Sequence, residues 1–163
     1  MTQFHTIKIK KYSDVIEEFT AAAALSPGML IELTSAGTVQ KHNNDGGNVL
    51  PMFALEDELQ GGGITTAYAA NAQVQCWIPY RGDIVYAILK DGQNVAIGDE
   101  LISAGDGTLM KYTHSNNSEF TMNPLQIVGW AAEAMNLSSS SGGDTDGVTL
   151  PGTGNRYMKV RIA

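Results

Sequence analysis

Three consecutive carboxylates, Glu56, Asp57 and Glu58, form the densest group of acid–base side chains in this sequence. A pair of carboxylates can act as general acid and general base when both lie beside one substrate. Neighbouring side chains of an extended strand point to opposite faces, so at most Glu56 and Glu58 share a side. No histidine is close to them in the sequence. This pattern favours a solvated acidic rim over a catalytic pair.

Metal-ligating residues do not occur at the spacings that metal sites require. His5, His42 and His114 are far apart, and none has a cysteine or carboxylate at ligand spacing. The run Asp144-Thr145-Asp146-Gly147 is similar to the start of a calcium-binding loop but lacks the glutamate at the twelfth position. We therefore expect no metal and interpret residues 138–147 as a polar loop.

Nucleotide and carrier chemistry also lack their signatures. A phosphate-binding loop needs a lysine after its glycines, but none follows Gly61-Gly62-Gly63, and Gly105-Asp106-Gly107 would place a carboxylate against the phosphate. Lys111 follows a methionine, as the lysine that carries biotin or lipoate does, but it lies inside an expected strand and not at a hairpin tip. We expect no cofactor, no small-molecule substrate and no enzymatic activity. A small β-barrel carrier or enzyme domain stays as an alternative.

Cys76 is the single cysteine and cannot form an internal disulfide. It lies in an apolar stretch, which is typical of a small buried hydrophobic residue. The sequence has neither a signal-peptide pattern at its start nor an apolar run of the ~18–20 residues that a membrane span needs. These features predict folding in a reducing cytoplasm and no membrane partner.

The net charge of −7 is distributed unevenly. Lys8, Lys10 and Lys11 lie near the start, and Arg156, Lys159 and Arg161 near the end, in two blocks without acidic residues. Residues 13–154 contain the other four basic residues and all seventeen acidic ones. Duplex DNA or RNA is bound by a basic stripe that neutralises several phosphates, and two short basic ends supply little of it. We therefore expect no nucleic-acid partner.

Short apolar or alternating runs separated by glycine-centred turns fill most of the chain and indicate a compact β protein. The expected strands are 4–10, 28–33, 38–42, 49–55, 74–78, 84–89, 97–102, 108–112, 125–135 and 157–162.

Several of these segments carry more specific expectations. The apolar run 84–89 suits a central strand that is covered on both faces. Gly129 predicts a bulge or a close approach of neighbouring backbone. Residues 14–24 fit either a helix or an extended strand, and 64–72 fit one helical turn with Ile64, Ala67 and Tyr68 inward.

Five turn-and-strand motifs resemble those of tailed-bacteriophage capsid decoration (cement) proteins. They are Ala24 to Leu33 with its Ser26-Pro27-Gly28 turn, Ala54 to Gly61, Gly82-Asp83 before an apolar strand, Val95 to Leu101, and Gly105 to Leu109. The resemblance implies a role similar to that of the lambda head-decoration protein, which adds to the outside of the expanded shell and clamps neighbouring major capsid protein subunits. It covers residues 24–135.

The resemblance also implies a fold, a location and partners. The fold would be a mainly β, compact β-barrel or β-tulip-like domain of short strands with little helix; the extended N-terminal arm expected before it lies outside the resemblance. The protein would be made in the host cytoplasm and would lie on the capsid exterior of the virion. Its partners would be the phage major capsid protein and copies of itself in a homotrimer. A phage tail or receptor-binding structural protein, which shares the β content and polar loops, stays as an alternative.

The start of the chain is the expected site of capsid binding. We divide the chain into an extended arm, residues 1–13, and a single β-rich domain, residues 14–163. An alternating segment outside a domain can add as a strand to a neighbouring sheet. Deletion of residues 1–11 would then abolish shell binding but leave the domain folded, unless the segment is an ordinary edge strand of its own domain. The expected contact residues are Phe4, Ile7, Lys8, Ile9, Lys10, Lys11 and Tyr12.

Overall fold

Strands dominate the structure, a computed structural model that describes residues 4–12, 14–113, 124–139 and 148–163. Strand makes up 42% of it and helix 4%, which confirms the prediction of a mainly β protein. The helical part consists of two short 3-10 turns, η1 (Glu58–Gln60) and η2 (Pro124–Gln126). No helix of the described ranges is long and apolar enough to cross a membrane.

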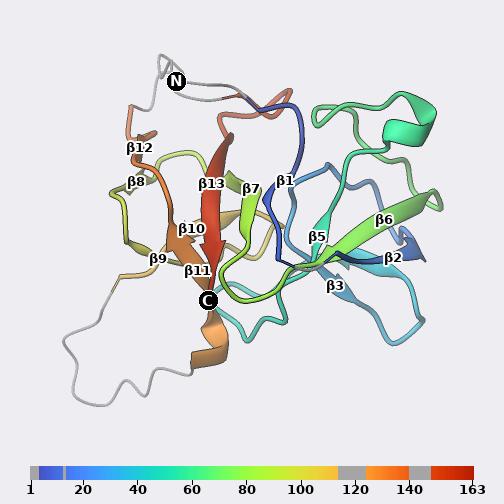
Figure 1. Ribbon diagram of the computed structural model, residues 1–163, viewed down its shortest axis with the longest axis horizontal. Coiled ribbons are helices and arrows are strands. Elements are labelled where there is room, and N and C mark those ends of the chain that lie inside the picture. The colour runs from blue at the N-terminus through green and yellow to red at the C-terminus, as the bar shows by residue number, and fades with distance from the viewer. Residues whose placement is uncertain (1–3, 13, 114–123, 140–147) are drawn as a thin grey trace.

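A closed barrel of five strands forms one half of the molecule (Figure 1). Its strands follow one another in space in the order β7, β10, β9, β11 and β13, and the pairing of β13 with β7 closes the ring. The bounds are β7 (Ile84–Leu89), β10 (Leu109–Lys111), β9 (Glu100–Ser103), β11 (Ile127–Ala131) and β13 (Arg156–Ile162).

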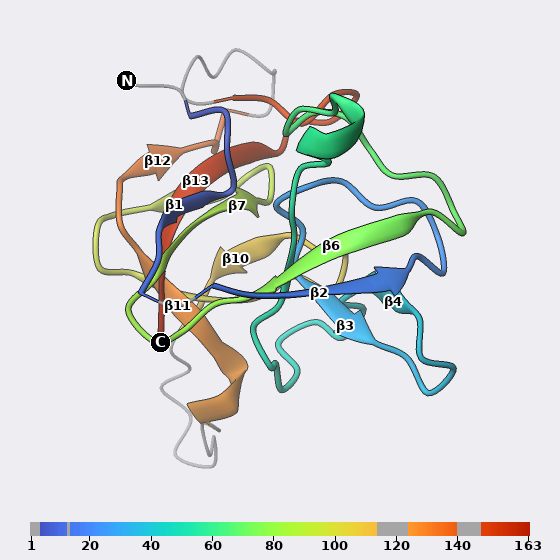
Figure 2. The ribbon, with the colours of Figure 1, turned by 45° about the vertical axis from the view of Figure 1, so that its right-hand side comes forward.

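The other half consists of a three-stranded sheet that lies beside a hairpin (Figure 2). The sheet has the order β2 (Val15–Thr20), β6 (Gln73–Ile78) and β5 (Phe53–Ala54), and the hairpin joins β3 (Ile31–Leu33) to β4 (Val39–Lys41). A short pair, β8 (Asn94–Val95) with β12 (Met135–Asn136), lies against the barrel side. The first apolar cluster fills the barrel and also includes Phe53 of β5 and Trp77 of β6. The second apolar cluster lies between the sheet and the hairpin and includes Val39, Val74 and Cys76; Met29 packs against both clusters.

Strand β7 is buried along most of its length and paired on both edges, as its apolar sequence predicts. Every residue from Val85 to Leu89 is buried. One edge of β7 pairs with β13 along its whole length, while β10 meets it only at Leu89. A strand that is covered on both faces and paired on both edges needs apolar side chains throughout.

Gly129 lies at a bulge of β11, where the pairing with β9 shifts between Ile127 and Gly129. A Cβ atom at this position would lie 2.2 Å from the carbonyl oxygen of Arg161 on β13. Both the bulge and the close backbone approach that the sequence indicates are therefore present.

The structure decides one local expectation that the sequence leaves open and corrects others. Residues 15–20 form strand β2, because β-branched and aromatic side chains pair there with all six residues of β6. No helix occurs within 64–72; Ile64 and Tyr68 are buried, but Ala67 is exposed. The 3-10 turn lies earlier, at η1, because the Asp57 carboxylate caps it and accepts a hydrogen bond from the Gln60 amide.

Two expected strands are shorter than their apolar runs. Within the run 49–55 only β5 pairs as a strand, and the run 125–135 is divided into η2, β11 and β12. Strand pairing ends where the neighbouring strands end, so an apolar run can continue beyond it as irregular chain.

The start of the chain packs on the barrel. Strand β1 (Lys8–Lys10) pairs antiparallel with β7 at Ile84 and Val85, on the part of the edge that β10 leaves open. Ile7 is fully buried in the barrel core. Residues 4–12 therefore pack on their own domain, with β1 as an edge strand, and do not form an arm that lies outside it.

Candidate interaction surface

The seven residues expected to contact a capsid divide into two groups. Phe4, Ile7 and Ile9 face the barrel, where Phe4 meets Tyr86 edge to face with ring centroids 5.6 Å apart. Lys10, Lys11 and Tyr12 are exposed, Tyr12 by 64%, and Lys8 is half-buried. Only the second group is available to a partner.

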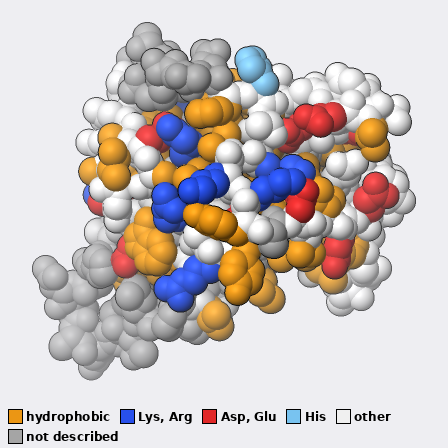
Figure 3. All heavy atoms as spheres, viewed as in Figure 1, with side chains coloured by type: hydrophobic (Ala, Val, Ile, Leu, Met, Phe, Trp, Pro, Cys, Tyr) orange, Lys and Arg blue, Asp and Glu red, His pale blue; other side chains and the backbone are white. Residues whose placement is uncertain are grey.

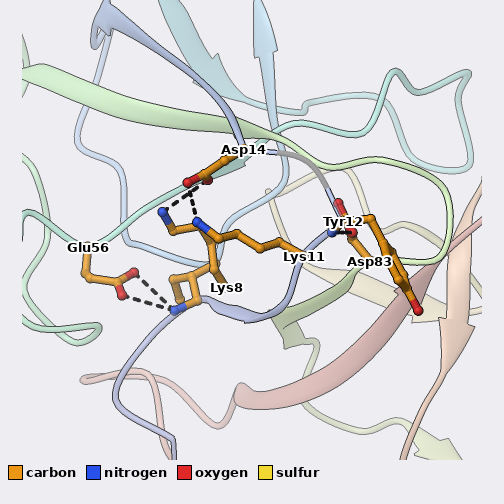
Figure 4. Close-up of polar contacts among 7 residues, drawn as sticks. Lys8, Lys11, Tyr12, Asp14, Glu56 and Asp83 are labelled. Atoms are coloured by element: carbon orange, nitrogen blue, oxygen red, sulfur yellow. Dashed lines mark hydrogen bonds and ion pairs between the residues drawn. The ribbon is translucent and has the colours of Figure 1, made fainter.

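Glu56 holds the N-terminal segment in place. Both of its carboxylate oxygens accept hydrogen bonds from the Ile7 amide, at 3.2 and 3.1 Å (Figure 4). The Glu56 side chain is buried, so it is not part of a solvated rim as the sequence suggests. Its neighbour Asp57 caps η1, and Glu58 is exposed. The three carboxylates thus lie in separate environments, and they do not form a pair of general acid and general base.

Asp83 fixes the other end of the same segment. Its buried carboxylate accepts one hydrogen bond from the Tyr12 amide, at 2.6 Å (Figure 4). It accepts another from the Tyr80 amide, at 2.7 Å. Gly82 supplies the left-handed backbone of this turn. The Gly82-Asp83 turn is evident from the sequence, but its partner Tyr12 is not, because the two segments are 71 residues apart.

The two basic ends of the sequence meet on one face of the barrel. Lys10 on β1 and Arg161 on β13 are both in register with Ile84 on β7, and side chains of directly paired residues point to the same side of a sheet. Figure 3 shows basic side chains gathered over β1, β7 and β13. We call this surface the basic face; its residues are Lys8, Lys10, Lys11, Tyr12, Lys159 and Arg161.

Part of this charge is neutralised within the domain. Asp14 pairs with Lys8, at 3.4 Å, and with Lys11 (Figure 4), and the hydrogen bond from Lys11 lowers the pKa of Asp14. Lys159 pairs with Glu133 at 3.1 Å. No carboxylate of the described residues pairs with Lys10 or Arg161. Lys10 lies over the Tyr12 ring instead, 5.2 Å from its centroid. These two cations remain available to an acidic partner.

A histidine, a serine and a carboxylate that are distant in sequence come together beside the hairpin. Nδ1 of His42 lies 2.7 Å from Oγ of Ser103, and its Nε2 lies 3.7 Å from a Glu32 oxygen. The types match a nucleophile and its base, but Ser103 has no exposed surface. His42 Nε2 also lies 3.2 Å from the Asn48 carbonyl oxygen. This cluster joins the end of β4 to β9, and although Glu32 and His42 line a groove, the serine hydroxyl is closed to a substrate.

The remaining candidate residues are scattered. His5 is exposed, whereas His114 and the run 144–147 lie outside the described residues. Lys111 belongs to a strand, as predicted, but is the last residue of β10, and it pairs with Asp99 at 2.7 Å. Within the part of the chain that the structure describes, no group of three or more His, Cys, Asp or Glu side chains is arranged to hold a metal ion.

Cys76 should be unreactive in the folded protein. Burial, with a smaller contribution from Glu17, raises the pKa of its thiol to about 12, and the thiolate is the reactive form. We expect negligible alkylation by iodoacetamide at about pH 8 without denaturant and complete alkylation in urea, measured by intact mass. Modification of the native protein at the rate of the unfolded one would contradict this environment.

Comparisons with known proteins agree with the fold. No protein-family model matches the chain, and no curated protein matches it. Among solved structures, it is similar to the crystal structure of the head fiber gp8.5 N base in bacteriophage phi29. The alignment covers 93% of this chain and 95% of that one, with a TM-score of 0.52 and 11% sequence identity. The two proteins thus share a fold over nearly their whole lengths.

Proposed function

We propose that this protein is a bacteriophage virion structural protein that binds the outer surface of the capsid through its basic face. The observation that carries the proposal is the fold shared with a phage head fiber base over almost the full chain. The turn motifs that resemble capsid decoration proteins support the same class of function. The exposed cations supply a surface that can bind.

The proposed partner is the major capsid protein, through an acidic patch on the shell. Complementary charges between two surfaces accelerate association and select orientation more than they add affinity. Tyr12, which is exposed between Lys10 and Asp83, adds a rigid aromatic contact of the kind enriched at interfaces.

Stabilisation of the shell follows from mass action. A protein that binds only the expanded shell shifts the equilibrium toward that state. Weak contacts at several capsid subunits act together, and a homotrimer would multiply them further. We propose this clamping role in place of any chemical turnover. Cryo-microscopy of purified virions would test it, since the protein should cover the shell in many copies and be absent from the tail.

Charge reversal on the basic face should weaken shell binding. We expect Lys10→Glu combined with Arg161→Glu to reduce affinity for expanded capsids by about tenfold or more, because two attractions become repulsions and each exposed pair contributes up to ~1 kcal/mol. Binding is measured by co-sedimentation of the purified protein with undecorated capsids at two salt concentrations.

The matched control is Lys41→Glu, which reverses an exposed charge on β4, outside the basic face. It should bind capsids as the unchanged protein does. Equal binding by the double variant and this control would reject the basic face as the capsid contact.

A further inference from the structure

A second surface, with the opposite charge, lies in the other half of the molecule. It is a groove of about 380 Å³ between the sheet β2-β6-β5 and the hairpin β3-β4. Phe19, Met52 and Ile78 lie along it, and Leu33 and Leu50 flank it. We call it the acidic groove, because Glu17 and Glu32 also line it.

The groove exists because the hairpin β3-β4 covers only one end of the second apolar cluster. On one side of β2 and β6, the pairs Phe19 with Val74 and Glu17 with Cys76 precede the pair Val15 with Ile78. Val74 and Cys76 are fully buried, but Val15 is 46% exposed. The sheet therefore extends past the part that the hairpin covers.

Apolar side chains at this open end are exposed to an unusual degree. Leu33 is 54% exposed and Leu50 is 87% exposed, although they come from different segments and line the same groove. Clustered exposed apolar side chains in a folded protein mark surfaces that bind other molecules.

The charges of the groove indicate what it binds. The Glu32 carboxylate accepts a hydrogen bond from Gln40 Nε2 at 2.8 Å, which fixes it in position. Glu17 lines the groove from the sheet side, on β2 opposite Cys76 of β6. The lining contains no lysine or arginine. A complementary occupant therefore brings cations beside apolar groups, and the long stems of Lys and Arg also suit an apolar floor.

The strand beside the groove indicates an extended occupant. β2 pairs with β6 on one edge, and along Val15–Thr20 no other strand of the described residues pairs with it. An unpaired edge can accept the main chain of an added strand, while side chains of that strand enter adjacent pockets.

We propose that the acidic groove binds an extended segment of a partner protein in which Lys or Arg side chains flank an apolar side chain. The cations would meet Glu17 and Glu32, and the apolar side chain would lie between Leu33 and Leu50. This site is separate from the basic face. Its partner carries positive charge, whereas the partner of the basic face carries negative charge.

The test uses a synthetic peptide, acetyl-Lys-Leu-Lys-Leu-Lys-amide, and its counterpart in which glutamate replaces each lysine. Binding to the full chain is followed by nuclear magnetic resonance titration. We expect the basic peptide to shift the resonances of Phe19, Met52 and Ile78 with a dissociation constant below about 1 mM, and the acidic peptide to leave them unchanged.

Matched variants locate the contact. Glu17→Gln with Glu32→Gln should weaken binding about fivefold, whereas Glu18→Gln, on the opposite side of the same strand, should not. Leu50→Ala should weaken binding by a similar factor. Leu59→Ala should not, because Leu59 is 81% exposed on η1 and does not line the groove. These positions are exposed or half-buried, so the variants should remain folded.

Three results would overturn the proposal. The first is no shift of the groove resonances at millimolar basic peptide. The second is equal binding of the two peptides, or equal effects of the groove variants and their controls. The third is a concentration-dependent shift of the same resonances in the protein alone, together with a dimer in light scattering, because the occupant would then be a second copy.

Discussion

Gly129→Ala is expected to destabilise the protein by roughly 3–5 kcal/mol, among the largest effects of a single methyl group. The added Cβ would lie 2.2 Å from the Arg161 carbonyl oxygen and 3.0 Å from a methyl group of Val160. The obstacle is backbone, so a rotamer change cannot relieve the clash with the oxygen. Because β11 and β13 are both barrel strands, their separation would break the ring.

Urea denaturation followed by tryptophan fluorescence measures this effect. Gly63→Ala is the matched control, because a Cβ at Gly63 has no neighbour within 4 Å and its backbone is not left-handed. Alanine there should change the unfolding free energy by no more than about 1 kcal/mol and can increase it, since it restricts the unfolded chain. Similar midpoints for both variants would show that β11 and β13 do not approach as described.

Deletion of residues 1–11 should destabilise the domain by roughly 4–7 kcal/mol. It removes the fully buried Ile7, whose truncation to alanine alone costs about 2–5 kcal/mol. It also leaves the buried Glu56 carboxylate without the Ile7 amide, and an unpaired buried charge adds about 1.5–3 kcal/mol. The Tyr86 amide loses its partner as well, the Ile7 carbonyl. Small domains have only about 5–15 kcal/mol in total.

The comparison is made by urea denaturation of the full chain, the truncated chain and two point variants. Ile7→Ala should show about half of the loss, and Lys10→Ala, which removes an exposed side chain of the same strand, should stay within about 0.5 kcal/mol. If the truncated protein is as stable as the full chain, residues 1–11 do not contribute to the folded domain and form an arm outside it. If it is unstable, its failure to bind capsids is uninformative, and charge reversal of Lys10 and Arg161 is the better test.

Local patterns predict much of the fold. The glycine turns before β7 and between β9 and β10, the hairpin of β3 and β4, and the buried character of β7 all depend on residues close together in sequence. Alternation along 157–162 likewise predicts β13. Where two conformations suited the same residues, as at β2, pairing with the distant β6 decided between them.

The candidate surfaces were less predictable. The sequence shows two basic blocks at its ends, but their union requires that β1 and β13 both approach β7. It shows Glu17 and Glu32 as ordinary exposed acids, and only the open end of the second apolar cluster brings them to one groove. The link between His42 and Ser103 crosses 61 residues and has no local signal.

The sequence by itself determined the class of fold, the positions of most turns, the burial of β7 and the uneven distribution of charge. Tertiary structure alone decided which strands pair, that residues 4–12 dock on β7, and which charges share a face. The reason is that side-chain periodicity and turn chemistry act over a few residues, whereas the pairing of distant strands depends on which buried surfaces fit together across the whole chain.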